Sequence, residues 1–565
     1  MLAPTLVVIG VFVVYPIVGT GYLSLTSWDG FSEIKKWVGL GNYTRLFRDP
    51  AFLNSLWVTV LYGAGVCVAG VVSGLGIAVL LNGAFRGRGV YRAVFFLPVV
   101  TSSIAAATVW RYVFGDTGVL DAVLRFLHLP APNWLGDPSL ALVSLVLLTA
   151  WKSLGLNVVL YLTALQTLPA DVYEAAAVDG ASRWQQLRRI TVPLLAPMTF
   201  FVVIEGLITS FQSFDLVYAL TGGGPRRHRD TGLPDLPGGF PALALRLRRC
   251  SGLHRLRPRA GRHADPVAAG RPGEVVVVSS VTTTPVPRPA TVARPTGRTA
   301  PVLRQLLLLA LAVVVVAPFA WMVTTSLKDY ADVYRPPYLW PQEFHVGNYG
   351  RAWDAAPFAG YYVNSLIMTG GILVGHVMLD TLAAYAFARL RFPLRNTLFL
   401  VLVATMLVPQ FVTVLPAYDL VIRLGWYDSY AALIVPRMAD VFGIVVLRAF
   451  MASIPAELDD AARLDGAGPW RSLWSVTLPL CRPALATVGM FSFLYAWNDF
   501  LWPLLVTSDD THRTIQLGLS TFSSKYGTYP ELLMAGTVTA AVPALVIFLF
   551  LQRAFIRGVA STGLK

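Results

Sequence analysis

Long apolar runs separated by short polar segments dominate the sequence. In the first half these runs lie at 3–25, 55–81, 91–114, 139–165 and 195–220. In the second half they lie at 302–326, 361–388, 394–418, 430–452, 482–506 and 531–555. A helix that crosses the hydrocarbon core of a membrane needs roughly 20 apolar residues, and an unpaired strand could not satisfy its backbone there. The pattern therefore predicts an all-α polytopic membrane protein with about eleven transmembrane helices, five and then six.

The composition agrees with this class. Hydrophobic residues make up 55% of the 565-residue chain, and charged residues only 13%, about half the share of a soluble domain. The first apolar run has no basic segment before it and is too long for a signal peptide, so we expect a retained span. The three cysteines, Cys67, Cys250 and Cys481, are too scattered for a disulfide framework or a zinc site, and we expect no metal site.

Basic loops predict the orientation of the spans. Short loops rich in Arg and Lys stay cytoplasmic, and such a loop follows the second span of each half. These loops carry Arg86, Arg88 and Arg92 in the first half, and Arg389, Arg391 and Arg395 in the second. Each half then begins in the cytoplasm and returns there after its fourth span. The location that follows is a prokaryotic plasma membrane, with the loops 26–54 and 327–360 outside.

A polar segment of thirty residues occurs twice. Residues 168–197 and 454–483 agree at thirteen of thirty positions at a constant offset of 286. In the first copy, Pro169 opens a short helix, Gly180 ends it with a turn of positive φ, and Trp184 lies on a second helix before the next span. The second copy has the same residue types at Pro455, Gly466 and Trp470. The pattern predicts a cytoplasmic helix–turn–helix that inserts into a partner's groove, or else an amphipathic connector at the membrane surface.

The motif within this segment, EAA-x₃-G-x₉-I-x-LP, resembles the coupling loop of binding-protein-dependent ABC importer permeases. Its residues in the first copy are Glu174, Ala175, Ala176, Asp179, Gly180 and Pro193. Its residues in the second copy are Asp460, Ala461, Ala462, Asp465, Gly466 and Pro479. The departures are mild: Val192 stands for Leu in the first copy, and Asp460 for Glu and Val476 for Ile in the second.

Two further stretches extend the resemblance to sugar importers of the maltose/multiple-sugar class. LTGGGP at 220–225 resembles the first type of subunit, and WNDFLWPLLV at 497–506 with SLKD at 326–329 resembles the second. The resemblance implies a fused pair of permease subunits with domains at 1–225 and 301–565. It also implies docking of the two coupling loops on two nucleotide-binding ATPase subunits, delivery of a sugar by an extracytoplasmic solute-binding protein, and contact with membrane lipid.

No phosphate-binding G-x-x-x-x-G-K-[ST] motif and no catalytic constellation occurs in the sequence. We therefore expect a translocation subunit rather than an enzyme, with no cofactor of its own, no nucleic-acid partner, and ATP bound by partner subunits. An ion-coupled secondary transporter is the alternative from another class; it explains the spans but not two coupling loops. The sequence does not indicate which sugar is carried.

Residues 226–300 break every pattern and hold most of the positive charge. Residues 222–300 contain fourteen Arg and four acidic residues, a net charge of +10 of the chain's +14, so basicity here does not indicate nucleic-acid binding. The segment is either a disordered Arg/Pro/Gly-rich linker or the product of out-of-frame translation that begins near Gly224–Arg226. The second alternative explains why a sixth span is missing from the first half. It also allows a nonfunctional frameshift fusion of two permease genes.

Polar and aromatic side chains recur near the fifth spans, where a substrate pathway would combine hydrogen bonds with aromatic platforms. Ionisable residues inside spans are Lys152, Glu205, Asp215, His376, Asp380, Asp440 and Asp499. The candidate pathway residues are Phe211, Gln212, Phe214, Asp215 and Tyr218 in the first half, and Tyr495, Trp497, Asn498 and Asp499 in the second. The alternative role for these residues is helix–helix packing and anchoring at the membrane surface.

Overall fold

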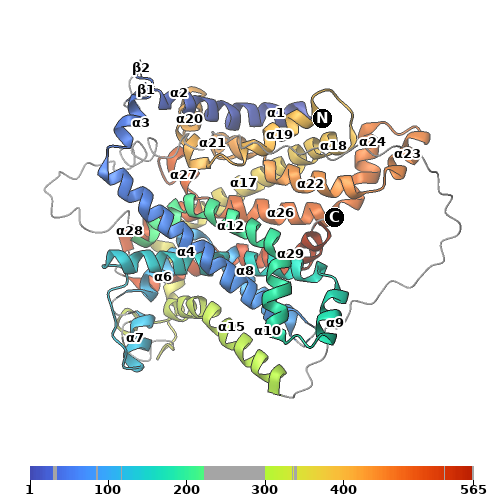
Figure 1. Ribbon diagram of the computed structural model, residues 1–565. Coiled ribbons are helices and arrows are strands. Elements are labelled where there is room, and N and C mark those ends of the chain that lie inside the picture. The colour runs from blue at the N-terminus through green and yellow to red at the C-terminus, as the bar shows by residue number, and fades with distance from the viewer. Residues whose placement is uncertain are drawn as a thin grey trace.

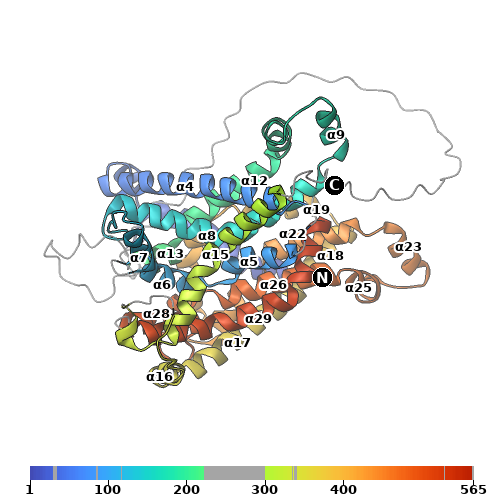
Figure 2. The same cartoon turned by 90° about the horizontal axis from the view of Figure 1, so that it is seen from below.

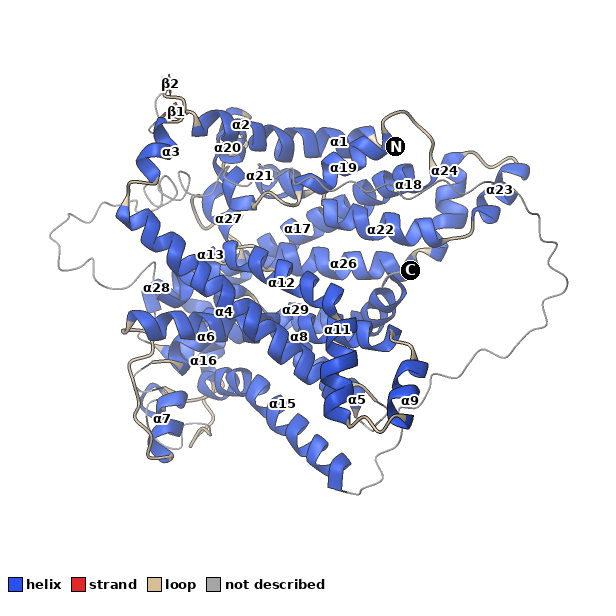
Figure 3. Ribbon diagram, in the orientation of Figure 1, coloured by secondary structure: helices blue, strands red, loops and turns tan. Residues whose placement is uncertain are grey.

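The computed structural model describes residues 1–28, 35–83, 85, 87–115, 118–221, 299–333, 335, 340–526 and 529–562. These residues form an elongated bundle of helices (Figures 1 and 3). Among them, one antiparallel pair of short strands, β1 (Thr26–Ser27) and β2 (Lys36–Trp37), pairs Thr26 with Trp37. The predicted linker 226–300, with its proposed change of reading frame, lies outside the described residues except at 299 and 300, where a helix begins.

The first half begins with one span in which a π-helical turn, η1 (Gly10–Val14), separates α1 (Ala3–Ile9) from α2 (Tyr15–Ser24). The helices that follow are α3 (Gly41–Leu46), α4 (Pro50–Leu81), α5 (Arg88–Val100), α6 (Ser103–Val113), α7 (Val119–Phe126), α8 (Pro138–Thr167), α9 (Ala170–Val178), α10 (Arg183–Gln186), the π-helical turn η2 (Leu187–Thr191), α11 (Val192–Leu194), α12 (Ala196–Phe211) and α13 (Phe214–Thr221).

The second half begins with α15 (Thr299–Ser326), the 3₁₀ turn η4 (Tyr330–Asp332), α16 (Gly347–Ala355), α17 (Phe358–Gly375), the π-helical turn η5 (His376–Asp380) and α18 (Thr381–Arg389). Then come α19 (Arg395–Thr405), α20 (Gln410–Arg423), α21 (Tyr430–Ile434), the 3₁₀ turn η6 (Val435–Arg437) and α22 (Val441–Ser453). The remainder is α23 (Ala456–Leu464), α24 (Pro469–Ser472), the π-helical turn η7 (Leu473–Thr477), α25 (Leu478–Leu480), α26 (Arg482–Trp497), α27 (Leu501–Val506), α28 (Ile515–Tyr526) and α29 (Pro530–Thr562).

The described helices confirm the prediction of about eleven spans. Six helices are long and apolar enough to cross a membrane, and the number rises to 11 when five bent helix pairs are counted as one span each. The third predicted span of each half is a bent pair of helices, a feature that the apolar runs did not reveal. The pair α5 and α6 bends by 98°, and the pair α19 and α20 by 99°. Extended backbone at Ser102 and Pro409, which cap the second helix of each pair, accounts for the bends.

The first span of each half packs on the opposite half. Thr5 on α1 donates a hydrogen bond of 2.8 Å to the carbonyl of Leu379, and Thr20 on α2 donates one of 2.8 Å to the carbonyl of Val412. In the reverse direction, the indole of Trp151 on α8 donates to the carbonyl of Val315 on α15 at 3.1 Å. In Figure 1, α1 and α2 run beside the second-half helix α20, while α15 lies against the first half. The two halves therefore form one interlocked bundle.

A shared hydrophobic core joins the halves along the bundle. The rings of Phe96 and Phe548 stack with centroids 5.0 Å apart, and Trp151 contacts Phe319 at 5.2 Å. The N-terminus and the helices α9 and α23 lie at one end of the bundle, and β1, α7 and α28 lie at the other (Figures 1 and 2). The N-terminus and both repeated segments thus share one end, and their cytoplasmic location stays a prediction.

Candidate functional site: two projecting coupling segments and a shared midplane

The two repeated segments fold in the same way. Each consists of a nine-residue helix, a turn at glycine, a short second helix, and a five-residue π-helical turn before a three-residue helix. Even the π-helical turns, η2 at 187–191 and η7 at 473–477, obey the offset of 286. Pro169 and Pro455 lie at the N-cap with ψ of 132° and 135°, so each precedes its helix instead of lying in the first turn as predicted.

The glycine turn of each segment has the predicted conformation. Gly180 has φ of 74° and Gly466 has φ of 77°, a left-handed conformation that other residues rarely adopt. The chain then closes back on the helix, because the amide of Ala181 donates to the carbonyl of Ala176 at 2.9 Å, and the amide of Ala467 to that of Ala462 at 2.8 Å. The repeated glycine is therefore explained by the turn that it makes.

The motif residues lie mostly on the surface of the projecting segments. In the first copy, Glu174, Ala175, Asp179, Gly180 and Pro193 are exposed and Ala176 is half-buried; in the second, Asp460, Ala461, Asp465, Gly466 and Pro479 are exposed and Ala462 is buried. Figure 2 shows α9 and α23 projecting from the same end of the bundle, away from the spans. The small motif residues thus lie on a surface that a partner can approach closely.

Apolar side chains project beside this motif at matching positions in both copies. Val178 is 88% exposed and its counterpart Leu464 is 90% exposed, each directly before the turn. Trp184 and Trp470 are 68% and 54% exposed. Sequence analysis singled out the tryptophans but missed Val178 and Leu464, although their shared apolar character at an otherwise polar tip was visible. Exposed apolar groups of this kind mark interaction surfaces.

The anchorage of the two segments differs. In the second half, Asp459 on α23 pairs with Arg389 at the end of α18 at 3.1 Å. The corresponding first-half residue is Tyr173, whose hydroxyl forms a hydrogen bond of 3.0 Å with Thr191 within its own segment. The second helix of the first copy also has a capping box between Ser182 and Gln185. The second segment is therefore held to a span by a salt bridge, whereas the first is held by hydrogen bonds within the segment.

The candidate pathway residues of the two halves meet within the bundle. The ring of Phe214 lies 5.9 Å from that of Phe411 and 5.7 Å from that of Tyr218, which in turn lies 6.4 Å from Phe500. Asn498 reaches across to donate to the carbonyl of Val100 at 3.3 Å. An aromatic run thus connects α13 with helices of the second half.

Three other candidates are Trp497, Phe211 and Gln212. Trp497 is 1% exposed, its indole donates to the carbonyl of Ala540 at 3.1 Å, and its ring stacks on Phe493 at 5.7 Å. Trp497 therefore fits the packing alternative. Phe211 is 38% exposed at the end of α12, and Gln212 caps that helix through its backbone.

A charged pair that sequence analysis missed lies beside the aromatic run. Arg437 on η6 forms a salt bridge with Asp499 at 3.3 Å and a hydrogen bond with Gln410 at 3.0 Å. Its guanidinium also contacts the hydroxyl of Tyr495 and lies 5.5 Å from the ring of Trp502. Arg437 falls within the predicted span 430–452, where an arginine is a signal of function, so the sequence contained the clue.

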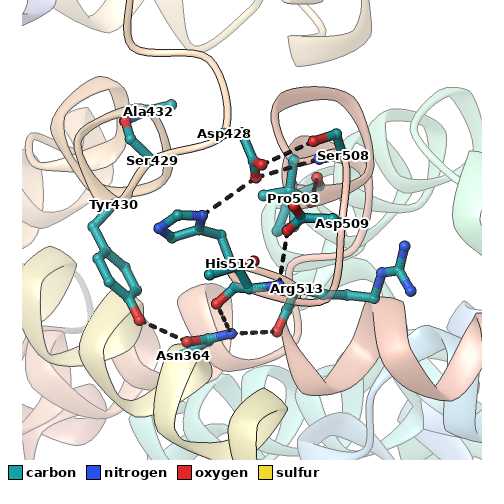
Figure 4. A network of polar contacts seen from close by, with 12 residues as sticks. Asn364, Asp428, Ser429, Tyr430, Ala432, Pro503, Ser508, Asp509, His512 and Arg513 are labelled. Atoms are coloured by element: carbon teal, nitrogen blue, oxygen red, sulfur yellow. Dashed lines mark hydrogen bonds and ion pairs between the residues drawn. The ribbon is translucent and has the colours of Figure 1, made fainter. Parts of the chain in front are cut away.

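A polar network links loops of the second half (Figure 4). Asp428 accepts hydrogen bonds from the amide and hydroxyl of Ser508 and pairs with His512 at 3.4 Å. The amide of Thr511 donates to Asp509 at 2.8 Å, and hydrogen bonds from Thr511 hold the pKa of the Asp509 carboxyl below its ordinary value. Ligand atoms of Asp428, Asp509 and His512 lie within 4.8 Å of one another. Each of these three side chains already has a partner within the protein. Their closeness is therefore explained by contacts that hold the loops together.

Taken together, the spans, the repeated segments at one end and the contacts between the halves define a polytopic membrane transport protein built from two similar halves. The family model for the binding-protein-dependent transport system inner membrane component matches residues 70–234 and again 380–561, and the chain belongs to this family. It is a multi-pass protein of the bacterial inner membrane and a translocation subunit.

Known relatives match about two fifths of the chain at a time. The sn-glycerol-3-phosphate transport system permease protein UgpE of Yersinia pestis bv. Antiqua (strain Antiqua) is 36% identical over 224 residues, which cover 39% of this chain and 80% of the relative. The trehalose/maltose transport system permease protein MalF of Thermococcus litoralis is 36% identical over 226 residues, covering 40% and 77%. A solved bacterial ABC transporter involved in alginate import is 23% identical with a TM-score of 0.42, covering 46% of this chain and 99% of that one.

Proposed function

We propose that this chain is a permease pair of an ABC importer for carbohydrates, with both subunits in one polypeptide. Residues 1–225 form the first permease domain and residues 301–565 the second. The observation that carries the proposal is the pair of matching segments, which project from one end and expose Val178 and Leu464 at their tips. Exposed apolar residues beside a polar turn suit contact with a partner protein.

The partners follow from this geometry. Two projecting tips of the same shape suit two copies of one partner, and the chain has no phosphate-binding motif, so we assign ATP hydrolysis to a pair of nucleotide-binding subunits. ATP binding draws these subunits together and moves both tips. The pair formed by Arg389 and Asp459 then transmits the motion from α23 to α18. On the opposite side of the membrane, a solute-binding protein delivers the cargo.

A carbohydrate is the cargo that best suits the aromatic and polar side chains where the two halves meet. Relatives that each match about two fifths of the chain carry names of glycerol-phosphate and trehalose/maltose systems. The aromatic run through Phe214, Tyr218 and Phe500 offers flat apolar faces, and Gln410 and Tyr495 offer hydrogen-bonding groups beside it. Sugars present both apolar faces and hydroxyl groups, so the two kinds of group are complementary to this class of ligand.

Reconstitution tests the proposal. The full chain is placed in proteoliposomes with ATPase and solute-binding subunits from the same host, and uptake of labelled sugars is measured. Uptake that requires ATP and both partners supports the importer. Uptake driven by an ion gradient without ATPase identifies a secondary transporter, and no uptake under either condition identifies a nonfunctional fusion; both outcomes contradict the proposal.

A further inference from the structure

Four charged groups lie close together where the two halves meet. Two cations, Lys152 and Arg437, face two carboxylates, Asp215 and Asp499. Arg437 pairs directly with Asp499, and both side chains are largely buried, at 15% and 11% exposed. Lys152 donates to the carbonyl of Thr101 at 2.6 Å and lies within electrostatic reach of Asp215. Neither cation is therefore available to a ligand without the loss of an existing partner.

Two of the exposed groups beside this set, Tyr495 and Gln410, are neutral. Tyr495 is 38% exposed and Gln410 is also exposed, and the amide of Gln410 donates to the hydroxyl of Tyr495 at 3.1 Å. Arg437 lies behind them, 5.4 Å from the ring of Tyr495. Asp440 also lies within electrostatic reach of Tyr495 and adds negative charge on this side. An incoming ligand thus meets an amide and a phenol before it meets the guanidinium.

Two buried acceptor atoms without a donor favour a ligand that carries hydroxyl groups. Among the described residues, the buried Oδ1 atoms of Asp215 and Asn498 have no hydrogen-bond partner. A buried acceptor without a donor costs free energy, and a hydroxyl group from a ligand would satisfy it. A phosphate or carboxylate group would not satisfy it, because an ionised oxyanion can only accept a hydrogen bond.

We propose that the pathway selects neutral sugars and disfavours sugar phosphates and uronates, through the pairing of Arg437 with Asp499 and the free acceptors of Asp215 and Asn498. This inference rests on the proposed carbohydrate permease and names its substrate class. The names of relatives do not decide the matter, since they cover an anionic cargo, glycerol 3-phosphate, and neutral ones, trehalose and maltose.

Removal of one carboxylate reverses the preference. Asp499→Asn leaves Arg437 buried beside the pathway without its counter-ion, a costly state that a ligand anion relieves. The double variant Arg437→Gln/Asp499→Asn removes one positive and one negative charge, so the net charge of the site is unchanged. Asp419→Asn is the matched control, because Asp419 forms a salt bridge with Arg423 at 3.0 Å on an exposed helix face.

The test is equilibrium binding to the full chain in nanodiscs, followed by tryptophan fluorescence. The probes are matched pairs that differ in charge: maltotriose and its derivative with one glucuronate, and glycerol and sn-glycerol 3-phosphate. We expect the neutral member of a pair to bind about tenfold more tightly to the unaltered chain and to the Asp419→Asn and double variants. We expect Asp499→Asn to bind the anionic member at least as tightly as the neutral one.

Two results overturn the inference: tighter binding of the anionic probe by the unaltered chain, and no binding of either probe from any pair. An unchanged preference in a folded Asp499→Asn variant overturns the role of the Arg437–Asp499 pair. ATP-driven uptake of an anionic sugar would contradict the selectivity while the importer stands, whereas absence of any ATP-driven uptake contradicts the importer itself. The two failures are therefore distinguishable.

Discussion

Arg389 and Asp459 form a salt bridge of 3.1 Å that joins the last turn of α18 to the projecting helix α23. The same guanidinium donates to the carbonyls of Met451 and Ile454 at 2.6 and 2.7 Å, where the preceding span ends. One side chain therefore holds two spans and the projecting helix together. The pair is largely shielded, with the two side chains 10% and 13% exposed, so it is stronger than an ordinary surface pair.

We predict that Asp459→Asn weakens the mechanical link between ATP hydrolysis and transport. Loss of the partly buried pair costs about 1–3 kcal/mol, between the values for surface and buried pairs. In proteoliposomes, fewer sugar molecules should then enter per ATP hydrolysed, while ATPase binding persists. Asp419→Asn, which changes an exposed pair at a distance from α23, serves as the control. An unchanged ratio of transport to hydrolysis would show that the pair does not transmit motion.

Replacement of either turn glycine should impair docking of the projecting segments. Gly180→Ala and Gly466→Ala each force a side chain into left-handed backbone, at a cost of about 1–2 kcal/mol. No other atom lies within 4 Å of the added methyl group, so the effect comes from the backbone alone. Affinity for the ATPase, measured by titration in detergent, should fall. Gly76→Ala, in a helix and equally free of contacts, should leave affinity unchanged.

The exchange of first spans between the halves has a measurable energetic consequence. The hydroxyl of Thr5, which is fully buried, donates to a carbonyl in the π-helical turn η5 of the other half. Thr5→Val should lower the free energy of unfolding by about 0.6 kcal/mol, the average for such bonds between membrane helices. Thr59→Val provides the comparison, because Thr59 bonds only within its own helix. Equal thermal stability of the two variants would argue against the interlocked arrangement.

The outer polar network depends on a single asparagine. Asn364 is 3% exposed, donates to the carbonyls of Thr511 and Arg513, and accepts from the hydroxyl of Tyr430. Asn364→Leu leaves these groups unpaired and should destabilise the protein by about 1–3 kcal/mol. Thermal unfolding in detergent measures the loss, with the exposed Asn396→Leu as the reference. If both variants unfold together with the unaltered chain, the network contributes nothing to stability.

The sequence predicted elements that depend on local chemistry. Long apolar runs located the spans. The glycine at equivalent positions of the two segments predicted the positive φ of Gly180 and Gly466. The bends after Val100 and Thr405 were missed, because a helix interrupted by extended backbone at Ser102 or Pro409 keeps its apolar composition. The exchange of first spans was also beyond reach, since an apolar run does not specify which helix it packs against.

In the candidate site, too, the sequence predicted local features but not those that depend on packing. The repeat identified the candidate coupling residues because two copies could be compared with each other. The candidate pathway residues offered no such comparison between two copies. From the sequence alone, Trp497 and Tyr495, two positions apart, were equally good candidates. The structure separates them: Trp497 is buried in packing, and Tyr495 lies on open surface beside Arg437. Side-chain direction on a helix surrounded by other helices depends on tertiary packing.

Site-specific crosslinking from the two projecting tips tests the central claim most directly. Single cysteines replace Val178 or Leu464 in a chain whose own cysteines are removed, and a third variant carries its cysteine at Trp37, which is 64% exposed near the opposite end. We predict that positions 178 and 464 crosslink to the ATPase and that position 37 does not. Absence of crosslinks from both tips, or labelling of both tips by a membrane-impermeant reagent added outside cells, would contradict the account.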